Sequence, residues 1–336
     1  MSEIHIISKM KNSDIILDVK NLSKTYSVEK GFFKKKVGSL RAVDNINLEL
    51  YKGETFGLVG ESGCGKSTLG MSILDGNIDS GSIKYNFDGK KLEFSKASSK
   101  DIKEFRKYAQ LIFQDPYSSL NSRMTIRDII GEPLLINSDL SKEAITDKVI
   151  TTLNLVGLDS GYLYRYPHAF SGGQRQRISI ARALILEPKF IVADEPTSAL
   201  DVSIQAQILN LLVKLQDKLN LTYLFISHDL SVIRHLADRI GIMYLGKIVE
   251  YGDNQTIFNH PKHPYTKALL QAIPLPNPKI VSGLKSAPGE IPNAMNPPTG
   301  CSFHPRCSEA KKLCLSKITS IKEINDKHYV SCHLYN

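Results

Sequence analysis

Hydrophobic and polar residues alternate in short segments along the first hundred residues, and glycine separates several of these segments. Residues 15–19 and 42–50 show the every-second-residue pattern that is typical of strands. Residues 81–87 and 90–94 flank an Asp-Gly pair, which favours a tight two-residue hairpin turn. The pattern therefore predicts an antiparallel sheet in the N-terminal part of the chain.

The second half of the pattern alternates between helical and strand periods. Residues 125–156 have a helical period, which we expect Pro133 and a Ser-Asp loop to break and Gly157 to end. We expect further buried strands at residues 109–113, 189–193 and 222–226, and helices at residues 174–186, 202–219 and 230–237. Strands and helices in alternation predict a parallel sheet covered by helices on both faces.

Composition adds the class of protein. The chain has 336 residues, of which 42% are hydrophobic and 23% charged, as in a soluble globular protein. No apolar run approaches the roughly 20 residues that cross a bilayer. The N-terminus has no basic segment followed by an apolar block, so we expect no secretion signal and a cytoplasmic protein.

Charge and proline content change near residue 255. The net charge is +9, an excess that is compatible with a nucleic acid or an anionic membrane surface as a neighbour but establishes neither. Residues 256–336 contain ten Lys and Arg against four Asp and Glu, and ten of the fifteen prolines. We therefore expect two domains, residues 1–255 and residues 256–336.

A phosphate-binding loop of the form G-x-x-x-x-G-K-[ST] follows the apolar residues 55–59. Its residues are Gly60, Glu61, Ser62, Gly63, Cys64, Gly65, Lys66, Ser67 and Thr68. Glycines let backbone N–H groups turn toward phosphate oxygens. Lys66 brings a positive charge to the β- and γ-phosphates, and the hydroxyl of Ser67 can ligate Mg²⁺. The alternative is a glycine-rich turn that binds nothing.

Two carboxylates end a later apolar strand, residues 190–193. The carboxyl end of a strand is where α/β sheets bind ligands. Asp194 suits the coordination shell of Mg²⁺, and Glu195, which points elsewhere, can polarise an attacking water. A solvated strand end is the alternative, but the pair follows a phosphate loop in the same chain.

A second anion-binding helix start is predicted at Ser171, Gly172, Gly173 and Gln174, which precede a helix. A flexible helix cap is the alternative. One nucleotide needs one phosphate loop, so a second such site requires an explanation. A head-to-tail dimer, in which each chain closes the nucleotide of the other, provides one.

Taken in order, these motifs resemble those of the ATP-binding cassette (ABC) transporter ATPases over residues 15–252. The matching positions are Gly60–Thr68 for Walker A, Gln114 for the Q-loop, Ser171–Gln174 for the signature motif with Phe170 where Leu is commoner, Phe190–Asp194 for Walker B, Ser198–Asp201 for the D-loop, His228 for the switch histidine and Tyr26 for the aromatic residue that stacks on adenine.

The resemblance implies a fold and a set of roles. The expected fold class is an α/β P-loop NTPase core with an antiparallel β subdomain, a helical subdomain at about residues 115–178, and a small irregular C-terminal domain that contains cysteines. It implies that Glu195 is the general base or water-orienting group, that His228 and Lys66 contact phosphate, and that Gln114 senses the γ-phosphate beside Mg²⁺. ATP would also meet the D-loop residue Asp201.

A narrower resemblance covers nearly the whole chain. Residues 114–121, residues 263–266 and the cysteine-containing tail are similar to those of the oligopeptide/dipeptide importer ATPases. The long segment between Tyr26 and Ala42, which includes residues 31–36, is similar to the F-type subunit of that pair. This implies ATP hydrolysis that drives peptide import at the cytoplasmic face of the membrane. The implied partners are a paralogous ATPase in a head-to-tail heterodimer, two transmembrane permease subunits and, indirectly, an extracytoplasmic peptide-binding protein.

Other functions stay open at this stage. Nickel and glutathione importers share the same kind of tail. A soluble ABC ATPase linked to nucleic acid is a further alternative, although such proteins usually have two cassettes or a long coiled-coil insertion, and we expect no nucleic-acid partner. A metal-sensing regulator without enzymatic activity is a third, which the presence of Glu195 and His228 argues against.

The cysteines raise separate questions. Cys301, Cys307, Cys314 and Cys332 have the spacing C-x5-C-x6-C-x17-C, whose first gaps are unlike those of zinc knuckles. A cytosolic location argues against disulfides. Four thiolates can hold a [4Fe–4S] cluster, which the resemblance to peptide importers also implies; four buried free cysteines are the alternative. At Cys64 the helix start can lower the thiol pKa, but we favour a side chain that points away while the backbone binds phosphate.

Overall fold

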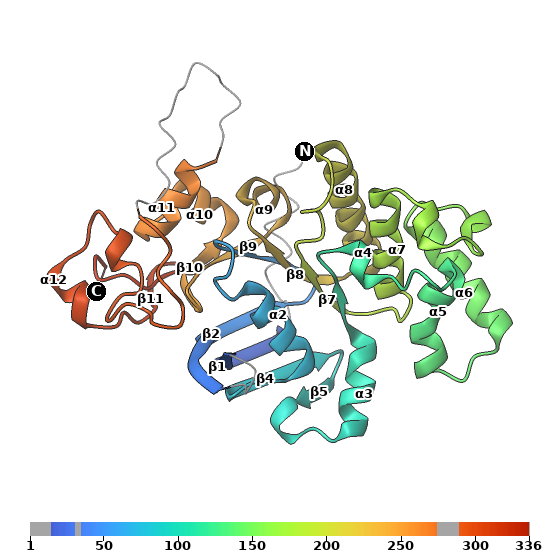
Figure 1. The fold of residues 1–336 in the computed structure, drawn as a ribbon, viewed down its shortest axis with the longest axis horizontal. Coiled ribbons are helices and arrows are strands. Elements are labelled where there is room, and N and C mark those ends of the chain that lie inside the picture. Colours follow the sequence, from blue (N-terminus) through green and yellow to red (C-terminus); the bar gives the residue numbers. More distant parts are fainter. Residues whose placement is uncertain (1–14, 31–34, 274–288, 336) are drawn as a thin grey trace, which may run out of the picture. The chain divides into compact units, whose positions relative to one another are not determined.

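The computed structural model describes residues 15–30, 35–273 and 289–335 of the chain (Figure 1). Residues 31–34, part of the segment used for the narrower resemblance, lie outside the described residues. The chain forms two compact units. The first unit comprises Met1–Asp18, Glu49–Glu54 and Lys84–Leu224, and the second comprises Val19–Leu48, Thr55–Ile83 and Phe225–Asn336.

The predicted hairpin is present in the first unit. Strand β5 (Lys90–Glu93) pairs antiparallel with β4 (Ser80–Phe87), and Phe87 lies opposite Lys90. Asp88 and Gly89 between them have φ values of 51° and 91°, the left-handed conformation that a two-residue hairpin turn needs. Helix α3 (Ser99–Tyr108) brings Phe105 to 4.4 Å from the Tyr85 ring centre, which gives this hairpin an aromatic core.

The α/β part of the first unit follows the predicted order. Strand β6 (Ala109–Ile112) pairs parallel with β7 (Phe190–Asp194), with Ala109 opposite Phe190. The chain then forms α8 (Val202–Leu219), whose apolar stripe is buried, and β8 (Thr222–Ser227). Parallel pairing of β6 and β7 places the residues that follow both strands at the same edge of the sheet.

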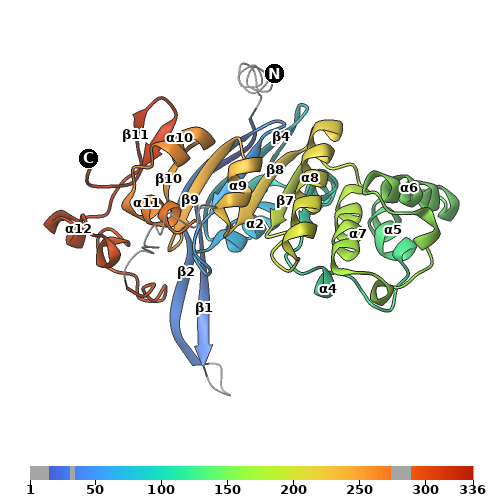
Figure 2. The same cartoon turned by 90° about the horizontal axis from the view of Figure 1, so that it is seen from above.

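A group of helices makes up much of the remaining first unit. Figure 2 shows α5 (Ile126–Asn137), α6 (Lys142–Leu155) and α7 (Gly172–Leu184) packed against one another. Shorter elements connect them: α4 (Pro116–Ser119), η3 (Ser160–Tyr162) and η4 (Pro167–Ala169). Gly157, with φ of 72°, follows the end of α6 as expected.

Pro133 does not break the helical segment, and this expectation was wrong. The proline lies inside α5, which continues to Asn137. A proline inside a helix removes one backbone hydrogen bond. Here the buried face of α5, which includes Ile126, Ile129 and Ile130, packs against neighbouring helices. Tertiary packing of that face offsets the lost hydrogen bond, so the chain stays helical through the proline.

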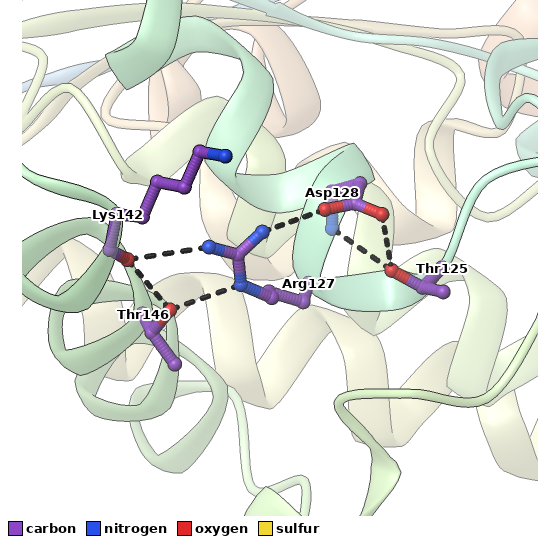
Figure 3. A network of polar contacts seen from close by, with 5 residues as sticks. All are labelled: Thr125, Arg127, Asp128, Lys142 and Thr146. Carbon is purple, nitrogen blue, oxygen red and sulfur yellow. Dashed lines mark hydrogen bonds and ion pairs between the residues drawn. The ribbon is translucent and has the colours of Figure 1, made fainter.

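Polar contacts join the first turns of α5 and α6 (Figure 3). Arg127 donates from Nε to the hydroxyl of Thr146 at 2.9 Å and from Nη2 to the carbonyl of Lys142 at 3.2 Å, and its Nη1 lies 2.8 Å from Asp128. The hydroxyl of Thr125 accepts from the Asp128 N–H and caps α5. One arginine thus links the start of one helix to the start of the next.

The second unit contains a sheet in the order β11-β12-β10-β9-β3. These strands are β3 (Thr55–Val59), β9 (Arg239–Tyr244), β10 (Lys247–Asp253), β11 (Lys322–Asn325) and β12 (His328–Val330). Strand β3 is parallel to β9, and the other pairs are antiparallel. Two longer strands, β1 (Ile15–Lys30) and β2 (Lys35–Tyr51), are neighbours and lie side by side in both views.

The helices of the second unit are short. They are α2 (Lys66–Asp75), α9 (Leu230–Leu236), α10 (Asn254–Asn259), α11 (Pro264–Gln271), α12 (Lys312–Ser316) and the turn η5 (His304–Arg306). The predicted domain boundary near residue 255 falls at the start of α10, and β12 returns from the later segment to pair with β10. Within the part of the chain that the structure describes, no helix has the length and apolar character to span a bilayer.

A buried carboxylate ties the later segment to β10. Glu250 is fully buried, and its oxygens accept from the N–H groups of Lys262 at 2.7 Å and His263 at 2.9 Å. The ring Nε2 of His328 lies 2.7 Å from the same carboxylate. Buried charges are tolerated when they are hydrogen-bonded in this way. Glu250 therefore fixes both the entry to α11 and strand β12.

Burial of His263 predicts a loss of stability in acid. Burial lowers the pKa of His263 from 6.5 to about 4, and its Nδ1 accepts from the N–H of Tyr265. Because the unfolded chain takes up a proton near pH 6.5 and the folded one does not, stability present above that pH is lost as the pH falls toward 4. We expect this residue to account for on the order of 2 kcal/mol of that loss.

The measurement is the free energy of unfolding by urea at both ends of this range. In His263→Asn, which keeps a helix-capping side chain, the free energy of unfolding should fall less between pH 6.5 and pH 4 than in the unmodified protein. His235→Asn, at an exposed position of the same unit, is the control and should behave as the unmodified protein does. An equal drop in His263→Asn would contradict the assignment.

Candidate functional site

Strand β3 leads directly into the phosphate loop in the second unit. All five residues of β3 are buried, residues 60–65 form the turn, and α2 begins at Lys66. Gly63 and Gly65 have φ values of 78° and 106°, which favour glycine. A Cβ atom at Gly65 would lie 2.0 Å from the carbonyl oxygen of Ala42, and one at Gly60 would lie 2.2 Å from that of Met243. Two of the motif glycines are therefore required by close backbone packing.

Lys66 lies over the loop that it follows. Its Nζ donates to the carbonyls of Gly60 at 2.8 Å and Glu61 at 3.1 Å, and the side chain is buried. Among the described residues no side chain caps the start of α2 at Gly65. The helix therefore presents its positive end at the loop, an arrangement that attracts phosphate.

Two further predicted residues of the second unit are accessible. Tyr26 on β1 is 44% exposed, and the Nζ atom of Lys24 lies 5.5 Å from its ring centre. His228 directly follows β8 and is exposed. The next residue, Asp229, caps α9 by accepting from the N–H of Ser231 at 2.7 Å. Both an exposed aromatic ring and an exposed imidazole are suitable for contact with a ligand.

In the first unit the structure joins two of the predicted residues. Gln114 follows β6 and Glu195 follows β7, and the side-chain Nε2 of Gln114 donates to Oε2 of Glu195 at 3.1 Å. Glu195 has a φ of 43°, an uncommon conformation for a residue other than glycine. Such strain often occurs at functional sites. Asp194 is the last residue of β7, so both carboxylates stand at the carboxyl end of the strand.

The predicted second anion site caps helix α7. Ser171 and Gln174 form a reciprocal capping box: the serine hydroxyl accepts from the Gln174 N–H at 3.4 Å, and the Ser171 N–H donates to the Gln174 side chain at 3.0 Å. Cβ atoms at Gly172 and Gly173 would lie 3.3 Å from Leu200 and 2.5 Å from Ile204. The glycines thus allow α7 to approach the start of α8, where Asp201 lies exposed before Val202.

Cys64 is a buried thiol inside the phosphate loop. It is 4% exposed, and its Sγ lies 3.9 Å from Nζ of Lys66. Burial raises its pKa and outweighs the lowering effect of Lys66. The lowered thiol pKa considered from the sequence is therefore wrong, and the favoured interpretation of an inaccessible side chain agrees with the burial.

The predicted iron–sulfur cluster is not supported. All four late cysteines lie in described segments, and no group of three or more His, Cys, Asp or Glu side chains that could hold a metal ion occurs there. Burial raises the pKa values of Cys301, Cys307 and Cys332, the last to about 11. The Sγ of Cys314 accepts instead from the N–H of Lys311 at 3.4 Å.

Sequence reasoning missed two residues that contact the phosphate loop. Tyr265 and Arg306 both bind Glu61, although they follow it by 204 and 245 positions. The segment 263–266 was noticed only as a family resemblance, and no spacing rule connects either residue to the loop. The carboxylate of Glu61 inside a phosphate loop is the one sequence feature that could have pointed to a cationic partner.

Burial of Cys64 predicts that it reacts slowly with iodoacetamide. Alkylation needs an accessible thiolate, and both burial and the raised pKa oppose it. We expect modification at least about tenfold slower in the folded protein than in denaturant. Cys307, which is less buried in the same chain, serves as the internal control and should react faster. Peptide mapping by mass spectrometry gives both rates, and equal rates would contradict the prediction.

Two family models match the chain in succession. A model described as "ABC transporter" matches residues 43–198, and one described as "Oligopeptide/dipeptide transporter, C-terminal region" matches residues 249–314. Among solved structures, cbiO1 from Clostridium perfringens, part of the ABC transporter complex cbiONQ, is 28% identical with a TM-score of 0.61, over 74% of this chain and 92% of its own. The ATP-binding cassette MJ0796, in a dimeric post-hydrolysis state with ADP and Pi, has the same identity and TM-score, over 71% of this chain and 99% of its own.

These matches confirm the expected α/β P-loop fold with antiparallel β and helical subdomains and a C-terminal region. Curated relatives extend the similarity over nearly the full chain. The "Oligopeptide transport ATP-binding protein AppF" of Bacillus subtilis (strain 168) is 47% identical over 97% of this chain and 99% of its own. The "Dipeptide transport ATP-binding protein DppF" of Haemophilus influenzae is 44% identical over 97% of this chain and 98% of its own. The chain therefore belongs to the ABC transporter family, as an ATP-binding subunit of the oligopeptide/dipeptide transport type.

Proposed function

We propose that the chain hydrolyses ATP to power the import of oligopeptides or dipeptides through a membrane ABC transporter. The observation that carries this is the succession of two matches in one chain, an ABC transporter cassette followed by the C-terminal region of oligopeptide/dipeptide transporters. Relatives named for oligopeptide and dipeptide transport cover nearly the whole chain and support the same substrate class.

In the second unit we assign phosphate binding to Gly60–Thr68. The positive end of α2 and the charge of Lys66 attract the triphosphate, and Lys66 exchanges its loop carbonyls for phosphate oxygens. Tyr26 stacks on adenine through its exposed ring, and His228 contacts the γ-phosphate. These roles agree with the accessibility of both side chains and with the order of motifs in the family.

In the first unit we assign the water-activating role to Glu195. Its hydrogen bond with Gln114 gives the carboxylate a fixed partner, and Gln114 reports the state of the γ-phosphate. Asp194 and Gln114 supply a carboxylate and an amide oxygen in the first unit, and Ser67 supplies a hydroxyl oxygen in the second; each is of the hard type that Mg²⁺ prefers. When bound there, Mg²⁺ would neutralise charge on the phosphates.

We assign Ser171–Gln174 and Asp201 to the nucleotide of a partner ATPase in a head-to-tail dimer. The dimeric cassette MJ0796, solved with ADP and Pi, supports such an assembly. The partner would be a paralogous ATPase subunit, with two transmembrane permease subunits above the pair and an extracytoplasmic peptide-binding protein acting through them. We further propose that the chain works at the cytoplasmic face of the membrane, and we expect no nucleic-acid partner.

Glu195→Gln tests the catalytic assignment. Removal of the carboxylate should lower the ATP turnover rate by at least about a hundredfold while ATP stays bound, because general-base catalysis of this kind contributes 10²–10⁴-fold. Turnover is measured by phosphate release and binding by retention of labelled ATP. Glu187→Gln, an exposed carboxylate of the same unit paired with Lys148, is the control and should keep full turnover. Undiminished turnover in Glu195→Gln would refute the role.

Uptake into vesicles tests the substrate class. The chain is purified with the subunits that accompany it, reconstituted, and supplied with ATP and labelled dipeptides, oligopeptides, nickel or glutathione in parallel. We expect ATP-dependent uptake of peptide at least about tenfold above that of nickel and glutathione, because a site that hydrogen-bonds peptide groups discriminates against ligands without them. Preferential uptake of nickel or glutathione would replace peptide as the substrate.

A further inference from the structure

Two residues of the C-terminal region, Tyr265 and Arg306, form hydrogen bonds with one residue of the phosphate loop, Glu61. The backbone N–H of Glu61 donates to the hydroxyl of Tyr265 at 2.9 Å. Arg306 donates from Nη1 and Nη2 to the two carboxylate oxygens of Glu61 at 2.8 and 2.9 Å. A bidentate arginine–carboxylate pair has a defined geometry as well as charge. Both the backbone and the side chain of Glu61 are thus held by residues far along the chain.

The two gripping residues are themselves rigid. Arg306 is 5% exposed at its side chain, and its guanidinium carbon lies 5.9 Å from the ring centres of both Tyr244 and Phe303. Tyr265 is fully buried, with its ring 4.7 Å from that of Tyr244 and 5.3 Å from that of Phe303. Because these rings pack on one another, neither the Arg306 guanidinium nor the Tyr265 hydroxyl can move away from Glu61 without opening the aromatic cluster.

The aromatic cluster is connected to the sheet. Tyr244 ends β9, the strand that pairs with β3, which leads into the loop. Tyr265 lies in the first turn of α11, whose entry is fixed by the N–H groups of Lys262 and His263 on the buried carboxylate of Glu250. The grip on Glu61 is therefore anchored to the same strands that support the loop.

Charge gives this grip a consequence for ligand binding. A carboxylate in a phosphate loop repels a triphosphate, and within a partly buried site such repulsion is weakly screened. The Arg306 guanidinium offsets the charge of Glu61. The carbonyl of Glu61 also accepts from Nζ of Lys66 at 3.1 Å. The position of Glu61 therefore helps to set the position of the Lys66 ammonium group before phosphate binds.

We propose that Arg306 and Tyr265 are positioning residues of the nucleotide site, through which the C-terminal region fixes the position of Glu61 in the phosphate loop and neutralises its charge. The proposal rests on the proposed function, because it requires that the loop binds ATP. It gives the C-terminal region a role in ATP affinity. Neither residue contacts the reacting atoms, so the effect falls on binding rather than on the chemical step.

The experiment uses the full chain in its purified transporter and measures KM for ATP and kcat separately. Arg306→Met, which keeps length and removes charge, should raise KM about tenfold and change kcat less than about twofold. Arg306→Lys keeps the positive charge but cannot form the bidentate pair, so its KM for ATP should lie between those of the unmodified protein and Arg306→Met.

Matched variants separate electrostatics from structure. Lys267→Met removes another ion-paired cation of the same region, beside Glu309, and should leave KM unchanged. The double variant Glu61→Gln with Arg306→Met should recover KM to within about threefold of the unmodified protein, because no unpaired carboxylate remains. A folded Arg306→Met protein with unchanged KM, or a double variant no better than Arg306→Met, would overturn the proposal.

Folding failure of Arg306→Met leaves the proposal testable. Tyr265→Phe deletes one hydroxyl and keeps the aromatic packing, and it should raise KM about threefold with kcat unchanged. Unchanged KM in a folded Tyr265→Phe protein would then overturn the proposal. If the unmodified chain neither binds nor hydrolyses ATP, the proposed function fails; if it does both and the variants match it, the inference about Arg306 and Tyr265 alone fails.

Discussion

The phosphate loop turns in a space too small for a side chain at two of its residues, and the order of the second unit depends on that constraint. Gly60 lies against the carbonyl of Met243 in β9, and Gly65 lies against that of Ala42 in β2. The loop is therefore packed on two strands in addition to β3, from which it continues. Rigid strands fix where α2 begins, and with it the direction of the positive helix end.

Buried charges organise the C-terminal region, which has little regular structure. Glu250 holds two backbone N–H groups and His328, and Arg306 holds Glu61. Breaking such a buried pair by removing one partner costs roughly 3–5 kcal/mol, whereas replacing both partners with apolar residues is often neutral. The main effect of these charged pairs is therefore on specificity rather than on net stability. They determine which residues come into contact in a segment with little regular structure.

Local chemistry explains which elements could be predicted. The hairpin at Asp88 and Gly89 follows from turn preferences, and the stripe of α8 follows from helical periodicity. Pro133 shows the limit, because burial of one face of α5 outweighs a local rule. Gln114 and Glu195 were each recognised from sequence, but their hydrogen bond depends on the parallel pairing of β6 and β7, which brings two strand ends to one edge.

The sequence by itself determined the family, the order of its motifs and most elements, because glycine requirements, periodicity and turn residues act over a few positions. Only the tertiary structure decided that Tyr265 and Arg306 reach Glu61, and that the late cysteines, within the described segments, form no metal-holding group. The physical reason is distance along the chain: contacts across two hundred positions depend on how all the intervening segments pack, which no local pattern encodes.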